Sequence, residues 1–237
     1  MRRDLSRDKR FSARAVEAYA RGPALDGLQV RAAADVPEIL MYDRIGASLW
    51  DGGGVVAADV VAALADAGGG PVRVRINSPG GDVFEGLAIY NALLGYSGTV
   101  EVVVDGVAAS AASIIALAGT TVAMQDASLL MIHNASTMAY GTKADMAATG
   151  GVLGKIDATL AGVYATKTGK PAAEAAAMMD AETWFTSAEA LVGGFVDSVI
   201  PAPVKPKAAA VLPIVAEVLP VSEDGRARRL RLASLSH

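Results

Sequence analysis

Hydrophobic positions along the chain switch repeatedly between strand-like and helix-like spacing. Short apolar or alternating runs predict strands at residues 38–43, 72–76, 100–104, 121–124 and 129–132. Apolar positions spaced as on one face of a helix predict helices over residues 55–67, 83–94 and from the alanine- and serine-rich segment to about residue 118. Because strands that alternate with helices form crossover units, this pattern predicts a layered α/β fold with a largely parallel sheet.

Helices dominate the pattern in the second half of the chain. Alanine-rich stretches predict helices over residues 142–167 and 171–179. A short strand at 184–185 is followed by Thr186-Ser-Ala-Glu189, a capping box that opens another helix, and Gly193-Gly194 ends that helix. Residues 195–200 are expected to close the domain.

Both ends of the chain differ from its middle in composition. Residues 1–35 are charged and rich in Ala and Arg, with a short helix compatible with 11–20, and we expect a flexible N-terminal arm. A proline-rich start marks residues 201–237 as a linker and tail, which contain an apolar segment at 211–221. The folded domain is therefore expected over residues 36–200.

Composition narrows the class of protein. With 237 residues and 52% hydrophobic content the chain can bury a substantial core, and its net charge of −4 disfavours a nucleic-acid-binding surface. The lack of cysteine excludes disulfides, thiolate metal sites and a Cys nucleophile, and we expect neither a metal nor another cofactor. No apolar run approaches the roughly 18 residues of a membrane span, and the N-terminus lacks the apolar centre of a signal peptide. We therefore expect a soluble, cytoplasmic protein with no membrane partner.

The candidate chemistry centres on a serine, a histidine and an acid. The chain has two histidines and the second is its last residue, so imidazole chemistry in the folded domain falls on His133. Ser110 or Ser113 could lose a proton to that base, an acid from 180–184 could orient it, and the Ser-Pro-Gly-Gly turn at 78–81 could supply oxyanion donors. The same residues are also typical of close helix packing, a satisfied core histidine and a tight turn, so the residues alone leave both interpretations open.

The order of four motifs is recognisable. They are Ile76-Asn-Ser-Pro-Gly-Gly-Asp82, Gly106-Val-Ala-Ala-Ser-Ala-Ala112, Met131-Ile-His133, and Trp184-Phe-Thr-Ser-Ala-Glu-Ala190 followed by Gly194-Phe-Val-Asp-Ser198. Together they resemble the proteolytic subunit of Clp protease, and more narrowly the Clp-like head maturation proteases of tailed phages and prophages. The resemblance covers about residues 36–200 and implies an α/β Clp/crotonase-like fold, with layered ββα units and a handle helix.

The resemblance implies roles for the candidate residues. Its nucleophile falls on Ser110, which leaves Ser113, a turn further on, as a packing residue. Its base falls on His133. Matching without gaps places Glu182 where the family has an Asp, and Asp180 is the alternative third triad member if the loop is shifted.

The resemblance also implies oxyanion donors and an assembly element. The backbone N–H groups of Ala111 and Gly81, or of Gly80, would form the oxyanion hole, and a helix dipole that begins near Ser110 would add favourable partial charge. Residues 141–167 resemble the handle helix through which family members pair into rings, so a homo-oligomer is implied.

These roles imply an ATP-independent serine endopeptidase that cleaves scaffold and capsid proteins during phage head maturation, in the bacterial host cytoplasm or the prohead. The first 35 residues show no match to the N-terminal loop by which the housekeeping subunit engages an unfoldase. Three alternatives stay open. They are a housekeeping Clp-type peptidase that works with an ATP-dependent unfoldase, an inactive structural homologue, and a crotonase-type acyl-CoA enzyme, which shares the fold without needing the serine, histidine and carboxylate set.

Overall fold

The structure, a computed structural model, describes residues 27–31, 36–47 and 53–203. The described residues up to Ala202 belong to one compact unit. Most of the predicted N-terminal arm, including the helix expected at 11–20, lies outside the described residues. The predicted tail from residue 204 onward, with its apolar segment, lies outside them as well.

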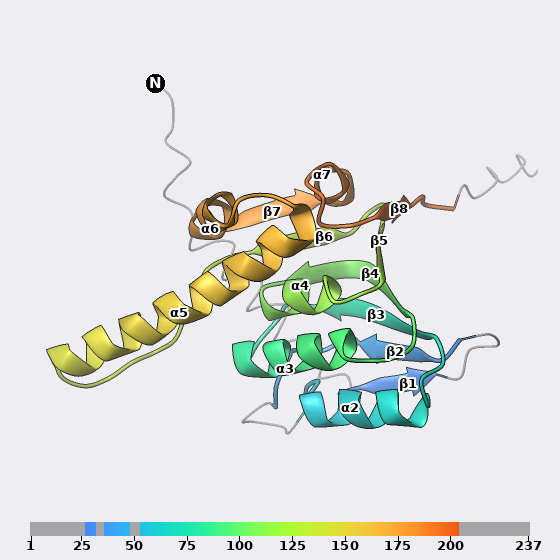
Figure 1. Ribbon diagram of the computed structural model, residues 1–237, viewed down its shortest axis with the longest axis horizontal. Coiled ribbons are helices and arrows are strands. Elements are labelled where there is room, and N and C mark those ends of the chain that lie inside the picture. Colours follow the sequence, from blue (N-terminus) through green and yellow to red (C-terminus); the bar gives the residue numbers. More distant parts are fainter. Residues whose placement is uncertain (1–26, 32–35, 48–52, 204–237) are drawn as a thin grey trace, which may run out of the picture. The chain divides into compact units, whose positions relative to one another are not determined.

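A mainly parallel sheet forms the centre of this unit (Figure 1). Its strands are β1 (Gln29–Arg31), β2 (Glu38–Met41), β3 (Val72–Ser78), β4 (Val100–Ala109), β5 (Thr121–Gln125), β6 (Leu129–Ile132), β7 (Thr183–Thr186) and β8 (Ser198–Ile200). The hydrogen-bonded order is β1-β2-β3-β4-β5-β8, and β6 pairs with β4 and with β7. The β1–β2 and β6–β7 pairs are antiparallel, and the other five pairs of named strands are parallel. The largely parallel sheet predicted from the sequence is therefore confirmed.

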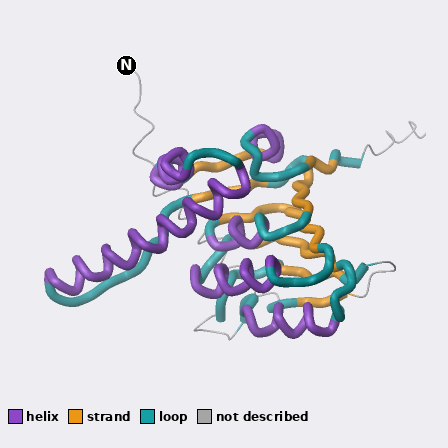
Figure 2. Tube along the Cα trace, in the orientation of Figure 1, coloured by secondary structure: helices purple, strands orange, loops and turns teal. Residues whose placement is uncertain are grey.

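Helices connect the parallel strands and cover one face of the sheet (Figures 1 and 2). The first three are α2 (Ala57–Asp66), α3 (Val83–Leu94) and α4 (Ala111–Ala116), and each leads from one parallel strand to the next. The helices α5 (Lys143–Thr168), α6 (Ala172–Asp180) and α7 (Ser187–Val192) follow β6. The buried core lies between the sheet and these helices.

Strand β3 shows how the sequence pattern separates the two faces of the sheet. Its apolar residues Val72, Val74 and Ile76 are almost fully buried in the core. The intervening Arg73 and Arg75 are only partly buried, because successive side chains of a strand point to opposite faces. The alternation predicted for residues 72–76 therefore reflects one apolar face under the helices and one charged face.

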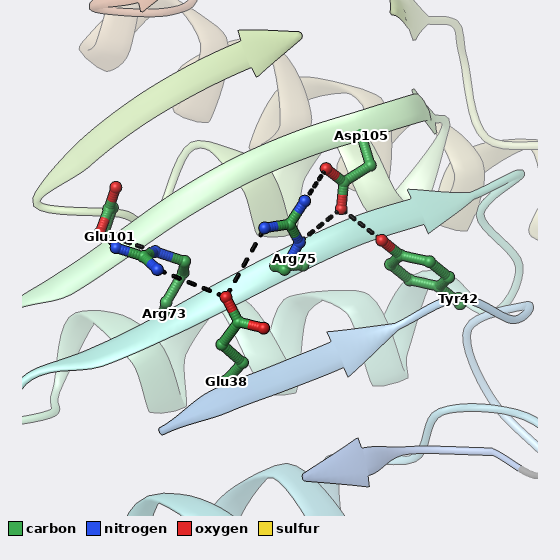
Figure 3. A network of polar contacts seen from close by, with 6 residues as sticks. All are labelled: Glu38, Tyr42, Arg73, Arg75, Glu101 and Asp105. Carbon is green, nitrogen blue, oxygen red and sulfur yellow. Dashed lines mark hydrogen bonds and ion pairs between the residues drawn. The ribbon is translucent and has the colours of Figure 1, made fainter. Parts of the chain in front are cut away.

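The charged face carries a network of ion pairs and hydrogen bonds across three strands (Figure 3). Arg75 donates to both carboxylate oxygens of Asp105, and the Tyr42 hydroxyl donates to the same carboxylate. Further along β3, Arg73 pairs with Glu38 and Glu101. Because the network joins β2, β3 and β4 on the side away from the core, it neutralises charges that the strand pattern brings close together.

Two strands differ from the prediction. The stretch 1–35, expected to be an arm, contains β1, whose three side chains are exposed and whose backbone pairs with β2. A strand ordered by backbone pairing alone leaves no alternating side-chain pattern to detect. Strand β4 continues past Val104 to Ala109 because its last residues pair with β6.

The predicted handle helix is α5. It begins at a capping box in which Thr142 and Asp145 bond reciprocally, and it ends at Gly169, whose φ is 69°. Its buried residues are Leu160, Ala161 and Tyr164, all in its second half, whereas most of its earlier residues are exposed. Neither α5 nor another helix in the described part of the chain is both long and apolar enough to span a membrane.

Candidate active site

Two neighbouring parallel strands bring Ser110 and His133 together. Ala109, the last residue of β4, pairs with Met131 in β6, and the Ser110 N–H donates to the Met131 carbonyl oxygen at 2.9 Å. His133 directly follows Ile132, the last residue of β6. Because parallel strands end at the same edge of a sheet, the two candidate residues leave their strands side by side.

The Ser110 hydroxyl lies within hydrogen-bond distance of the imidazole. Ser110 Oγ and His133 Nε2 are 2.7 Å apart. Ser110 has φ 55° and ψ −127° at the junction of β4 and α4, a conformation of the kind that costs a non-glycine residue about 1–3 kcal/mol. Ser113, in contrast, is buried inside α4, and its Oγ donates to the Ser110 carbonyl oxygen. Of the two serines, Ser110 is therefore the one presented to the histidine.

Burial of the imidazole lowers the pKa of His133. The negative charges of Glu182 and then Asp157 raise this pKa, without outweighing burial. His133 is therefore neutral at neutral pH. A neutral imidazole can accept the proton of a hydroxyl hydrogen-bonded to its Nε2.

The two acids predicted as third triad member have different surroundings. Glu182 is half-buried, has a left-handed φ of 49°, and is the carboxylate with the largest effect on the pKa of His133. Asp180 is exposed, and its Oδ1 accepts a hydrogen bond from Asn134 Nδ2 at 2.7 Å. The electrostatics thus favour Glu182 over Asp180 as the partner of His133.

Asp157 is a carboxylate that sequence reasoning did not identify. It lies on α5, raises the pKa of His133, and accepts a hydrogen bond from the Ala135 N–H at 2.7 Å through Oδ1. No local motif marks this residue, because its approach to His133 depends on how α5 packs beside the end of β6. On sequence alone, an acid in a long alanine-rich helix is typical of a solvated surface.

The glycine turn after β3 lies against the Ser110 backbone. A Cβ added at Gly80 would lie 2.5 Å from the Ala109 carbonyl oxygen and 2.7 Å from Ser110 Cβ, so only glycine fits there without displacement. Gly81 and Ala111, the predicted oxyanion donors, line the same cavity as Ser110. Ala111 is the first residue of α4, and the N–H of such a residue has no acceptor within its own helix.

A cavity of about 300 Å³ lies beside Ser110 and His133. An apolar part of its wall comes from α4 and α5, with Ile114, Val152, Leu153, Ile156, Leu160 and Tyr164, and polar residues such as Asp82, Ser136 and Thr149 line other parts. A cavity with this lining suits an apolar side chain of a bound peptide, held next to the reactive hydroxyl. Within the described ranges, no three His, Asp or Glu side chains are grouped so that they could hold a metal ion.

Sequence comparison finds relatives that are named as proteolytic subunits of Clp protease. The chain is 34% identical over 132 residues to the ATP-dependent Clp protease proteolytic subunit 3 of Rhodococcus jostii (strain RHA1). The aligned region covers 54% of this chain and 65% of that protein. It is 32% identical over 148 residues to the ATP-dependent Clp protease proteolytic subunit 1 of Mycobacterium tuberculosis (strain ATCC 25618 / H37Rv). That aligned region covers 61% of this chain and 74% of the Mycobacterium protein. The match therefore spans just under two thirds of the Rhodococcus protein's length.

Structural and family comparisons agree with this result. A ClpP1 variant from Listeria monocytogenes superposes with a TM-score of 0.60 at 24% sequence identity, over 70% of this chain and 91% of the other. This likeness confirms the predicted Clp/crotonase-like fold. Residues 52–203, which include the serine, the histidine and both candidate acids, match the family described as Clp protease. The chain belongs to the Clp protease family.

Proposed function

We propose that this protein is a Clp-type serine endopeptidase. The observation that carries the proposal is the 2.7 Å separation of Ser110 Oγ and His133 Nε2 beside a cavity with a partly apolar wall. A strained serine, a neutral imidazole and a nearby carboxylate provide a nucleophile, a base and an orienting group for acyl transfer. Membership of the Clp protease family supports the same chemistry.

In the proposed reaction the protons move between Ser110 and His133. His133 Nε2 takes the hydroxyl proton as Ser110 Oγ attacks the scissile carbonyl carbon, and the carbonyl oxygen becomes an oxyanion that accepts hydrogen bonds from the N–H groups of Gly81 and Ala111. The imidazolium then gives its proton to the departing amine as the C–N bond breaks. Water, deprotonated by His133 in turn, hydrolyses the acyl-enzyme and restores the serine.

Glu182 is the proposed third member of the triad. Its charge favours the imidazolium that forms during the reaction, which is the role of the acid in such triads. The glutamate side chain is one methylene longer than that of the aspartate in the family pattern. The backbone of Glu182 is in the left-handed region, which is uncommon for a residue other than glycine and changes the direction in which the side chain leaves the backbone. Asp180 is the weaker candidate because its carboxylate is engaged by Asn134.

Two biological settings fit this activity. The order of the motifs, which resembles that of phage head maturation proteases, supports ATP-independent cleavage of scaffold and capsid proteins. The names of the bacterial relatives, which are proteolytic subunits of ATP-dependent proteases, favour a second candidate, a subunit that works with an unfoldase. In both settings the exposed first half of α5 supports assembly into a homo-oligomer.

An active-site-directed fluorophosphonate tests the proposed chemistry. Intact mass spectrometry of the wild-type protein is expected to show a single adduct, and Ser110→Ala and His133→Ala are expected to show none. No adduct on folded wild-type protein would refute the peptidase proposal and favour a structural homologue or an acyl-CoA enzyme. Cleavage of unfolded casein with and without an added unfoldase and ATP separates the two settings, because the phage-type enzyme should need neither.

A further inference from the structure

Two buried hydroxyl groups lie behind the Ser110 backbone, and the reaction described above does not use them. Ser113 is 0% exposed and Tyr164 is 1% exposed. Their oxygen atoms are 2.7 Å apart, although the residues belong to different helices, α4 and α5. Burying hydroxyl groups is unfavourable unless they are hydrogen-bonded. The groups to which these two hydroxyls bond therefore indicate what the pair stabilises.

The direction of the hydrogen bonds follows from the number of protons. Ser113 Oγ lies 2.6 Å from the Ser110 carbonyl oxygen, and a carbonyl oxygen only accepts, so Ser113 gives its single proton to Ser110. Tyr164 must then donate its own proton to Ser113 Oγ. Burial raises the pKa of Tyr164 above its ordinary value of 10.0, so this donor is protonated at neutral pH. The result is a directed chain from the Tyr164 hydroxyl through Ser113 to the Ser110 carbonyl.

This chain acts on the residue whose backbone is strained. The Ser110 carbonyl accepts from Ser113 Oγ and also from the Ser113 N–H at 2.9 Å. The Ser110 N–H donates a hydrogen bond to the Met131 carbonyl oxygen. Strained backbone persists only where its surroundings fix it, and here both peptide groups that flank the reactive side chain are fixed.

We propose that Ser113 and Tyr164 are positioning residues that align Ser110 Oγ with His133 and make this alignment depend on the docking of α5. Ser113 is then more than the packing residue expected from the sequence. The inference rests on the proposed function, since it concerns the reactivity of Ser110. It goes beyond that function because it assigns to α5 an effect on the nucleophile through hydrogen bonds.

Three variants separate a positioning role from simple stabilisation. Ser113→Ala removes the direct donor to Ser110. Tyr164→Phe removes only the second donor and keeps the ring that packs against Phe195, with ring centroids 6.2 Å apart. Ser128→Ala is the matched control, because Ser128 is 1% exposed and its Oγ donates to the Gln125 carbonyl oxygen, the same i to i−3 geometry away from the site.

The readouts are the second-order rate of fluorophosphonate labelling and the kcat and KM for a peptide substrate. Misalignment of the nucleophile is expected to slow labelling and lower kcat roughly 10- to 100-fold in Ser113→Ala, and less in Tyr164→Phe, with the acid limb of the pH profile unchanged in both variants. KM should be unchanged in Ser113→Ala, because Ser113, unlike Tyr164, does not line the cavity beside the nucleophile. The double variant should match Ser113→Ala, because the Tyr164 hydroxyl acts through Ser113. Ser128→Ala should label at the wild-type rate even where its thermal unfolding temperature falls.

The outcomes distinguish this inference from the proposed function. Wild-type labelling rates in folded Ser113→Ala and Tyr164→Phe would overturn the positioning role while leaving the peptidase intact. An equal loss in the Ser128→Ala control would overturn it too, because the effect would then follow stability. Failure of the wild-type protein to label would refute the peptidase proposal and this inference with it. If Ser113→Ala does not fold, Tyr164→Phe alone decides between the first two results.

Discussion

Replacing Gly80 by alanine tests whether the glycine turn sets the position of the nucleophile. The new Cβ would lie 2.5 Å from the Ala109 carbonyl oxygen, whereas ordinary contact begins at 3.4 Å, so the two groups must separate by about 0.9 Å. Ser110 Cβ, at 2.7 Å from the new Cβ, is also closer than ordinary contact allows and must move as well. Since a misplacement near 1 Å can lower a rate about 100-fold, we expect a loss of that order in the labelling of Ser110.

A second glycine provides the control for this substitution. Gly68, at the end of α2, also has a left-handed φ, 61° against 87° at Gly80, but a Cβ there meets nothing within 4 Å. Both substitutions add backbone strain of roughly 1–2 kcal/mol, and only Gly80→Ala adds the clash. Urea unfolding measures the stability of both variants, and fluorophosphonate labelling measures the nucleophile. Wild-type labelling of folded Gly80→Ala, or an equal loss in Gly68→Ala, would refute the reasoning.

Three further predictions concern charge. Glu182→Gln removes a charge that raises the pKa of His133, so kcat should fall and the acid limb of kcat/KM should move to lower pH; an unmoved limb would show that Glu182 is not the partner. Because burial lowers the pKa of His133 in the folded state, its contribution to stability is full above about pH 6.5 and is lost as the pH falls through the lowered pKa. Urea titrations at several pH values should show this dependence, and His133→Ala should lack it. Asp105→Ala leaves Arg75 without its main partner and should lower the free energy of unfolding in urea by about 1–3 kcal/mol. Glu101→Ala breaks a more exposed ion pair and should lower that free energy by less than about 1 kcal/mol.

Elements with local signals could be predicted closely from the sequence. The helix predicted over residues 83–94 and the strand over 129–132 have those bounds in the structure. The capping box of Thr186 and Glu189 is also present. These features depend on apolar spacing or on residues three apart, so a short stretch of sequence contains all the information they need.

Features that depend on distant pairing could not be predicted in this way. β1 has no apolar face, and the end of β4 is ordered by β6, so neither shows a strand pattern of its own. At the site, the resemblance singled out Ser110 and His133, which the structure brings together. The approach of Asp157 and the contact of Ser113 with Tyr164 arise from the packing of α5 and have no counterpart in a local motif.

The pairing of β4 with β6 limits where the chain can change in length. Three residue pairs, Val107 with Leu129, Ala108 with Leu130 and Ala109 with Met131, fix the separation of Ser110 and His133. An insertion of a single residue within β6 would turn every later side chain of that strand to the opposite face, and the histidine would leave the serine. An insertion at the exposed Asp126-Ala127 turn would leave this register intact. Length variants of this protein that keep the serine and histidine paired should therefore carry their extra residues in that turn, and loops grafted by design belong there too.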